Sequence, residues 1–141
     1  MSDLKVLFDP IRQKEVLAQP EECVRIAFIH EMLRLGYPSA LIRVEVDLAH
    51  STLRGKKAPK RRLDIVCYQK AFEGFLPLLL VECKAGKLSQ KAAHQAMGYN
   101  YYLGAPFVCL VGEDELQFGS ASLEKVDTLP TYSELIQMQT A

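Results

Sequence analysis

The pattern of apolar residues predicts a helix from Pro20 to about Leu35. Its apolar positions recur at helical spacing and are Val24, Ala27, Phe28 and Leu35. Pro20 suits the first helical turn, and the two glutamates that follow it favour the positive end of the helix dipole. Gly36 and Pro38 then end the helix.

Two strand patterns follow. Residues 41–48 alternate, with Ile42, Val44, Val46 and Leu48 on one face and charged residues on the other. Residues 62–68 form a second run rich in branched side chains, and we expect the two runs to pair as a hairpin. Residues 77–85 are almost continuously apolar at first, which is typical of a strand buried on both faces.

The C-terminal half predicts a strand, a helix and a strand in that order. Ser89 is suited to cap a helix that runs to about Leu103 and stops at Gly104, and residues 107–112 form the next strand. This order indicates a right-handed crossover between parallel strands. We further expect an edge hairpin at residues 112–119 and a closing helix at residues 128–138. Elsewhere in the chain, residues 5–13 are expected to form a short strand that turns at Asp9, and residues 69–75 a loop. The sum is one α/β domain over residues 1–141, a mixed β-sheet flanked by α-helices.

The charge composition argues against a protein that coats nucleic acid by bulk charge, because 17 basic residues balance 17 acidic ones. A local basic patch remains, since residues 54–62 (RGKKAPKRR) predict an exposed basic loop. No membrane span or signal peptide is expected, so a cytoplasmic location is the default. The four cysteines lack metal-site spacing and are expected to be buried free thiols.

Charged residues interrupt the apolar strands at two points. Asp64 lies within its strand, while Glu82 and Lys84 follow the apolar run of residues 78–81. Two positions apart on a strand, Glu82 and Lys84 face the same side. Burying such charges unpaired costs several kcal/mol each. Two interpretations of these charged residues remain, a structural ion-pair network or a metal site.

A metal site requires that the strands that carry Asp64 and Glu82 be neighbours in the sheet. Their carboxylates and the carbonyl of Cys83 would then make an all-oxygen site, which suits Mg²⁺, with Mn²⁺ as a substitute. Lys84 could position an attacking water or neutralise charge that develops at phosphorus. These are the groups that phosphodiester hydrolysis needs.

The residues Asp64 and Glu82-Cys83-Lys84 resemble the core motif of the PD-(D/E)xK nuclease superfamily. Five blocks in order, PEECVR, VEV, RRLDIV, LLLVECKA and HQAMGYN, resemble the N-terminal nuclease domain of type I restriction enzyme R subunits, from about Pro20 to Gly112. The resemblance implies a restriction-endonuclease-like three-layer fold and a magnesium-dependent DNA nuclease that uses a metal-activated water. R subunits continue into a helicase-like motor, and no Walker motif is present here, so ATP-driven translocation is not expected.

Site residues follow from the same resemblance. It implies that Asp64 and Glu82 bind metal and that Lys84 is the catalytic lysine. Glu22 and Glu45 match acidic positions that complete or support the metal site. The last two matches, Gln95 and Tyr99, form a QxxxY motif whose spacing puts both on one helix face, where they could orient the lysine, the metal waters or the DNA backbone. The superfamily's proline before the aspartate is replaced by Leu63.

Candidate contacts to DNA phosphates are Lys56, Lys57, Lys60, Arg61, Arg62 and Arg25. The alternative for the basic loop is a solvated hairpin tip, and for Arg25 a surface charge. The principal alternative function is a non-catalytic DNA-binding or assembly module that keeps the nuclease fold. An exonuclease with an iron–sulfur cluster is disfavoured because the cysteines are scattered. A homodimer, or a separate helicase or specificity subunit, stays open as a partner besides DNA.

Overall fold

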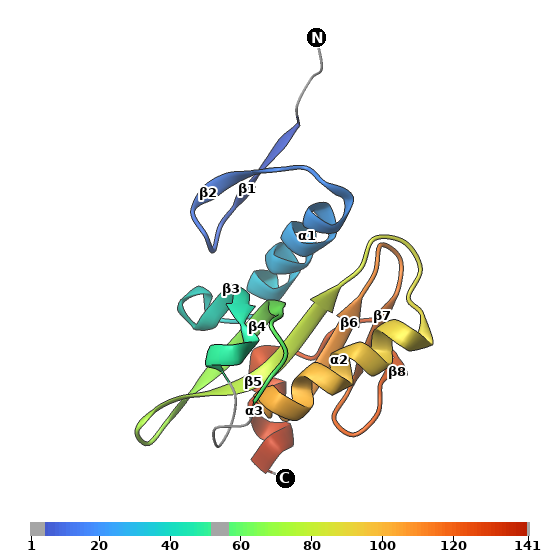
Figure 1. Cartoon of the computed structure of the whole chain (residues 1–141). Coiled ribbons are helices and arrows are strands. Elements are labelled where there is room, and N and C mark those ends of the chain that lie inside the picture. Colours follow the sequence, from blue (N-terminus) through green and yellow to red (C-terminus); the bar gives the residue numbers. More distant parts are fainter. Residues whose placement is uncertain (1–4, 52–56, 141) are drawn as a thin grey trace.

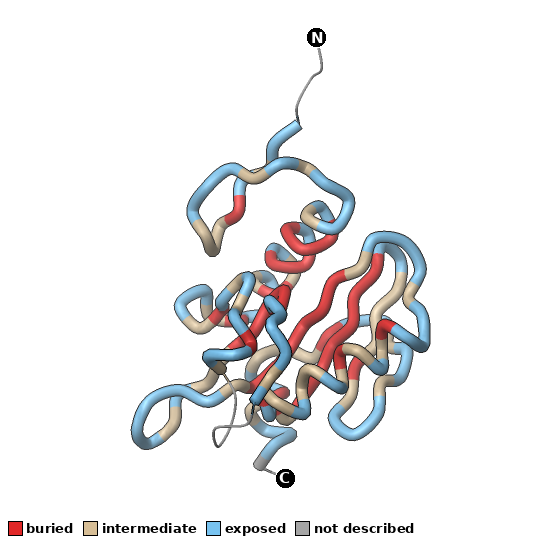
Figure 2. The backbone as a smooth tube through the Cα atoms, in the orientation of Figure 1, coloured by how far each residue is buried: buried red, intermediate tan, exposed pale blue. Residues whose placement is uncertain are grey.

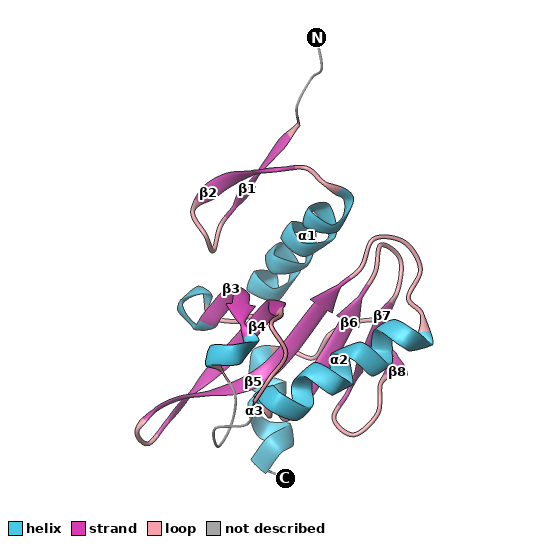
Figure 3. Cartoon of the chain, viewed as in Figure 1, coloured by secondary structure: helices cyan, strands magenta, loops and turns pink. Residues whose placement is uncertain are grey.

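The computed structural model describes residues 5–51 and 57–140, and within them it is a three-layer α/β fold (Figures 1 and 3). The helices are α1 (Pro20–Arg34), α2 (Gln90–Leu103) and α3 (Tyr132–Thr140), with 3₁₀ turns at Ser39–Leu41 and Leu48–His50. The strands are β1 (Val6–Asp9), β2 (Lys14–Leu17), β3 (Ile42–Asp47), β4 (Arg62–Ala71), β5 (Gly74–Cys83), β6 (Phe107–Val111), β7 (Leu116–Gly119) and β8 (Glu124–Lys125). The predicted fold class is confirmed. No helix in the described part of the chain is long and apolar enough to cross a membrane.

The main sheet has the order β3-β4-β5-β6-β7-β8, and a separate hairpin joins β1 to β2. Strands β5 and β6 are parallel and α2 connects them, as the strand–helix–strand order predicts. The other neighbours are antiparallel, including the predicted hairpin of β3 and β4 and the edge hairpin of β6 and β7. The centre of the sheet is therefore β5, paired on both sides.

Apolar residues form two cores, one on each face of the sheet. Figure 2 shows that buried residues are concentrated on the central strands and along α1. On β5, Leu79 and Val81 pack in the core that contains residues of α1 and α3, whereas Leu80 packs in the core that contains residues of α2. Because β5 is buried on both faces, its apolar run is continuous rather than alternating.

Several local predictions need correction. Lys14–Leu17 forms a second strand that was not predicted. Residues 69–75 are not a loop, because β4 and β5 pair as far as Ala71 and Gly74 and leave a turn of two residues. The tight turn is possible because Gly74 has a φ of +128°, which glycine alone adopts easily. The hydrogen bonds between the two strands outweigh the polar composition that predicted a loop. Two residues expected in the core, Ala27 and Cys23, are exposed, whereas the other three cysteines are buried.

Glu45 interrupts strand β3. Its φ of +54° is left-handed, which is uncommon for a residue other than glycine. Val44 pairs with Ile65 on one side of it and Val46 with Leu63 on the other. Val44 packs in the core under α1 and Val46 in the core under α2, so the prediction that they share one face is wrong. The turn of the backbone at Glu45 changes the face that the strand presents.

The left-handed backbone at Glu45 gives a first prediction. Glu45→Gly should be more stable than Glu45→Ala by about 1 kcal/mol, because a Cβ is unfavourable in this conformation. Urea denaturation of the two variants measures the difference. At Arg43, which has no positive φ, we expect the reverse order, with Gly less stable than Ala by about 0.5–1 kcal/mol. If the stability difference between the Gly and Ala variants is the same at positions 45 and 43, the backbone at Glu45 is not strained.

Candidate functional site

Two buried carboxylates lie side by side where β5 ends. Strands β4 and β5 are adjacent, and Ile65 pairs with Val81, so Asp64 and Glu82 stand at neighbouring positions one step further along. Asp64 is 8% exposed and Glu82 6%. The apolar strands on either side supply the rigid backbone, and the two acids share one end of it.

Asp64 is ionised and fully engaged. Arg25 donates from Nη2 to its Oδ1 at 2.8 Å, and the backbone N–H of Cys83 donates to its Oδ2 at 2.8 Å. Burial by itself would raise the pKa of Asp64, but hydrogen bonds from Glu82, from the Cys83 N–H and from Arg25 outweigh it, so the pKa lies below its ordinary value. Arg25 is itself buried, which would lower its pKa, but the hydrogen bond to Asp64 and the charge of Asp64 outweigh burial and raise the pKa of Arg25 above its ordinary value.

Glu82 has the opposite electrostatics. Burial, and then the neighbouring Asp64 carboxylate, raise its pKa to about 10, while the charge of Lys84 acts against this rise. Its Oε1 is buried and has no hydrogen-bond partner. Lys84 follows β5 directly, is half-buried, and donates its backbone N–H to the Val111 carbonyl at 2.8 Å. The pair of acids therefore carries one proton and one unsatisfied oxygen.

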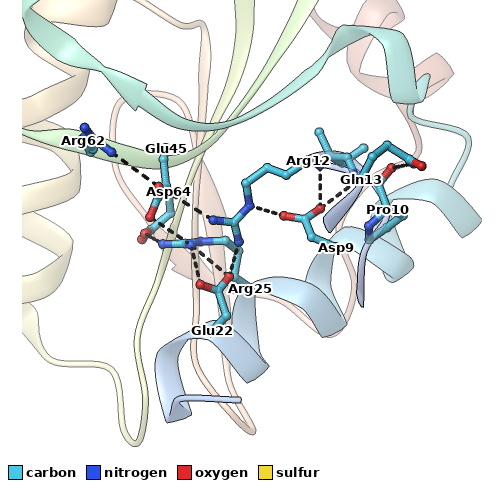
Figure 4. Close-up of polar contacts among 10 residues, drawn as sticks. Asp9, Pro10, Arg12, Gln13, Glu22, Arg25, Glu45, Arg62 and Asp64 are labelled. Carbon is cyan, nitrogen blue, oxygen red and sulfur yellow. Dashed lines mark hydrogen bonds and ion pairs between the residues drawn. The ribbon is translucent and has the colours of Figure 1, made fainter. Parts of the chain in front are cut away.

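Arg25 joins the acids of different elements (Figure 4). Its Nη1 lies 3.0 Å from Glu22 Oε1 on α1 and 3.5 Å from Glu45 Oε1 on β3, while its Nη2 holds Asp64 on β4. Glu22 and Glu45 thus lie close to the site, but their carboxylates form ion pairs with guanidinium groups. Among the described residues, no hydrogen bond joins Glu22 or Glu45 to Asp64 or Glu82.

Arg12, which sequence reasoning missed, is a second guanidinium in this cluster. It extends from the turn between β1 and β2 to Glu22, and its Nη1 lies 3.7 Å from Glu45 Oε2 (Figure 4). Asp9, which is fully buried, binds Arg12 Nε and accepts the backbone N–H groups of Ile11 and Arg12. The sequence marks Asp9 only as a turn residue, and no motif links Arg12 to Glu22.

The remaining predicted residues lie further from the acids. Gln95 and Tyr99 are half-buried on α2, and Tyr99 packs on the core beneath that helix. The guanidinium of Arg61 lies 5.9 Å from the Tyr99 ring centroid, within the range of a cation–π contact. No hydrogen bond or ion pair in the described part of the chain joins Gln95 or Tyr99 to Asp64, Glu82 or Lys84.

The basic segment is described in part. Lys57, Lys60, Arg61 and Arg62 are exposed. Arg62 Nη1 lies 3.6 Å from Glu45 Oε2, so this end of the segment reaches the acidic cluster. Lys56 lies outside the described residues. Arg25 is not the surface charge of the alternative reading, because it is 7% exposed and bound to Asp64.

The donor set suits a hard divalent cation in part. No group of three or more His, Cys, Asp or Glu side chains in residues 5–51 and 57–140 is arranged to hold a metal. Mg²⁺, however, is commonly bound through one or two carboxylates and several waters. Asp64 and Glu82 supply two, and the unpaired Oε1 of Glu82 is a buried acceptor that a cation would satisfy. Glu82 therefore offers a free acceptor for Mg²⁺, whereas Asp64, like Glu22 and Glu45, is already paired with an arginine and would have to share its carboxylate.

Comparison with known protein families identifies a family for this chain. A family model described as type I restriction enzyme R protein N terminus matches residues 20–134. Neither the comparison with curated proteins nor that with solved structures gives a match. The matched range contains Asp64, Glu82 and Lys84 and begins after the β1–β2 hairpin that carries Arg12.

The raised pKa of Glu82 gives a prediction about stability. The folded protein holds this proton more tightly than the unfolded chain, so Glu82 destabilises the fold as pH rises from its ordinary pKa of 4.5 towards about 10. Glu82→Gln keeps a donor for Asp64 without the charge. It should raise the free energy of unfolding by roughly 1–3 kcal/mol at pH 8 and by less at pH 5.

Urea denaturation at the two pH values measures this effect. The control is Glu113→Gln, because Glu113 is an exposed carboxylate in the turn after β6. If both variants change with pH in parallel, Glu82 is not a buried, protonated acid.

Proposed function

The chain belongs to the type I restriction enzyme R protein N-terminal family, and from this membership we propose that it is a magnesium-dependent DNA nuclease that hydrolyses phosphodiester bonds. The observation that supports the proposal most directly is the pair Asp64 and Glu82. Both are buried at the end of a central strand beside Lys84, and one carboxylate oxygen lacks a partner. Burying two acids together costs stability, and a site that binds a cation explains why the fold carries that cost.

Each residue has a definite role in this proposal. Asp64, Glu82 and the carbonyl of Cys83 would hold Mg²⁺ or Mn²⁺. When bound, the metal would supply Lewis-acid activation of water and of the phosphoryl oxygen. Lys84, half-buried next to the acids, would orient the attacking water or offset negative charge that develops at phosphorus.

The other predicted residues support the site in the proposal. Glu22 and Glu45 would reach a metal only after Arg12 and Arg25 release them, so we assign them to holding the arginines. Gln95 and Tyr99 lie on α2 and would support the site from that side of the sheet, where the Tyr99 ring contacts the guanidinium of Arg61. DNA phosphates would contact Lys57, Lys60, Arg61 and Arg62, which are exposed and of which Arg62 reaches Glu45.

One observation favours a second function. Arg25 bonds to both Asp64 and Glu22, which is what a structural network without metal would show. In that case the chain is a DNA-binding or assembly module with the nuclease fold. The unpaired oxygen of Glu82 argues against this alternative, because a network selected only for stability leaves few buried acceptors unsatisfied.

Cleavage assays distinguish the two functions. Plasmid, linear, single-stranded and branched DNA are incubated with Mg²⁺ or Mn²⁺ and the full chain. We expect metal-dependent cutting that falls at least about a hundredfold in Lys84→Ala and in Asp64→Asn. Lys87→Ala is the matched control, because Lys87 is an exposed lysine in the same loop.

Asp64→Asn also weakens the bond with Arg25, so its folding is checked by circular dichroism. Lys84→Ala has no such difficulty, since no described ion pair contains Lys84. If folded wild-type protein cuts none of the substrates, or if Lys84→Ala cuts as well as Lys87→Ala, the nuclease proposal is wrong. DNA binding without cutting would favour the non-catalytic module.

A further inference from the structure

Arg12 is held in a defined position at the site. The fully buried carboxylate of Asp9 binds its Nε and also fixes the turn that carries it. The Arg12 side chain is only 16% exposed, although it belongs to a small, largely exposed hairpin (Figure 2). Because Asp9 holds Arg12 Nε, the other two guanidinium nitrogens of Arg12 keep a fixed orientation, towards Glu22 and Glu45.

Glu45 lies among three arginines without a close bond to any of them. Its carboxylate oxygens are 3.5 Å from Arg25, 3.6 Å from Arg62 and 3.7 Å from Arg12. These distances exceed an ordinary N–H···O hydrogen bond. Glu45 has a 38% exposed side chain and a left-handed backbone. It is therefore the most accessible and most loosely held of the acids that contact Arg12 and Arg25.

We propose that Arg12, Arg25 and Arg62 form a phosphate-binding subsite, and that the Glu45 carboxylate fills it until a DNA phosphodiester takes its place. This inference rests on the proposed function, since it names where the substrate backbone would bind. It also gives the hairpin of β1 and β2, which precedes the residues matched by the family, a direct part in substrate binding.

Charge and shape support the exchange. A phosphodiester carries one negative charge and presents two non-bridging oxygens, as a carboxylate does. Replacing one by the other leaves the net charge around the three guanidinium groups unchanged. Arginine binds such paired oxygens through two parallel N–H groups, and phosphate would accept closer bonds than the present 3.5–3.7 Å separations. The exposed Arg61 and Arg62 lead from the basic segment to this point.

The first test is DNA binding measured by fluorescence anisotropy of a fluorescein-labelled oligonucleotide, single-stranded and duplex. It is run with EDTA and, separately, with Ca²⁺. Arg12→Gln should weaken binding at least about tenfold and lower the salt slope by about one. Lys14→Gln, which removes an exposed charge from the same hairpin, should weaken it less than about threefold. Arg12→Lys should recover part of the loss, because it keeps the charge but not the fork.

The second test uses Glu45. Glu45→Gln removes the negative charge that competes with DNA for the three arginines. It should tighten DNA binding about three- to tenfold, more than Asp47→Asn, which removes an exposed acid from the same strand. In the double variant with Arg12→Gln the gain should largely disappear, because the two residues act on the same phosphate. A hairpin that only stabilises the fold would not produce this coupling.

The outcomes separate this inference from the function on which it rests. If wild type cuts DNA and Lys84→Ala does not, while Arg12→Gln binds like Lys14→Gln, the subsite is wrong and the nuclease stands. The subsite is also wrong if Glu45→Gln and Asp47→Asn tighten binding equally. If wild type neither binds nor cuts DNA in any buffer, both proposals fail.

Discussion

The ion pair between Arg25 and Asp64 is the interaction on which the site depends. Both residues are buried, with 7% and 8% of their surface exposed, and each charge would cost several kcal/mol without the other. Because Arg25 belongs to α1 and Asp64 to β4, the pair also ties that helix to the sheet. Any packing of α1 that separated the two groups would leave a bare charge in the interior.

This constraint explains the unequal acids. Asp64 takes the hydrogen bonds from Arg25 and from the Cys83 N–H, so it keeps its charge. Glu82, next to it, has no such donor for its buried oxygen and holds a proton instead. Strands β4 and β6 flank β5 and fix the positions of both residues. The rigid sheet thus maintains a strained electrostatic arrangement that a flexible loop would relax.

The β1–β2 hairpin extends this cluster beyond the part of the chain that the family covers. It packs on the body of the protein through a few half-buried apolar residues, Leu7, Ile11 and Val16. Its only ion pairs to the rest of the described chain come from Arg12. The same guanidinium therefore helps to attach the hairpin and pairs with the acids Glu22 and Glu45.

Much of this arrangement was determined by the sequence itself. Helical spacing predicted α1, the apolar run of β5 predicted a strand buried on both faces, and the order of elements predicted the parallel pair of β5 and β6. These features depend on residues close together in the chain. The ExK residues were recognisable for the same reason, since Glu82 and Lys84 are local to one strand end.

Only the tertiary structure decided what surrounds those residues. Arg12 meets Glu22 because a hairpin folds back over α1, and Arg25 meets Asp64 across 39 positions of sequence. The left-handed backbone of Glu45 has no sequence signal, because glutamate does not favour it and the contacts that hold it come from other elements. Local patterns determine secondary structure, whereas charge pairing between distant elements is decided only when those elements pack.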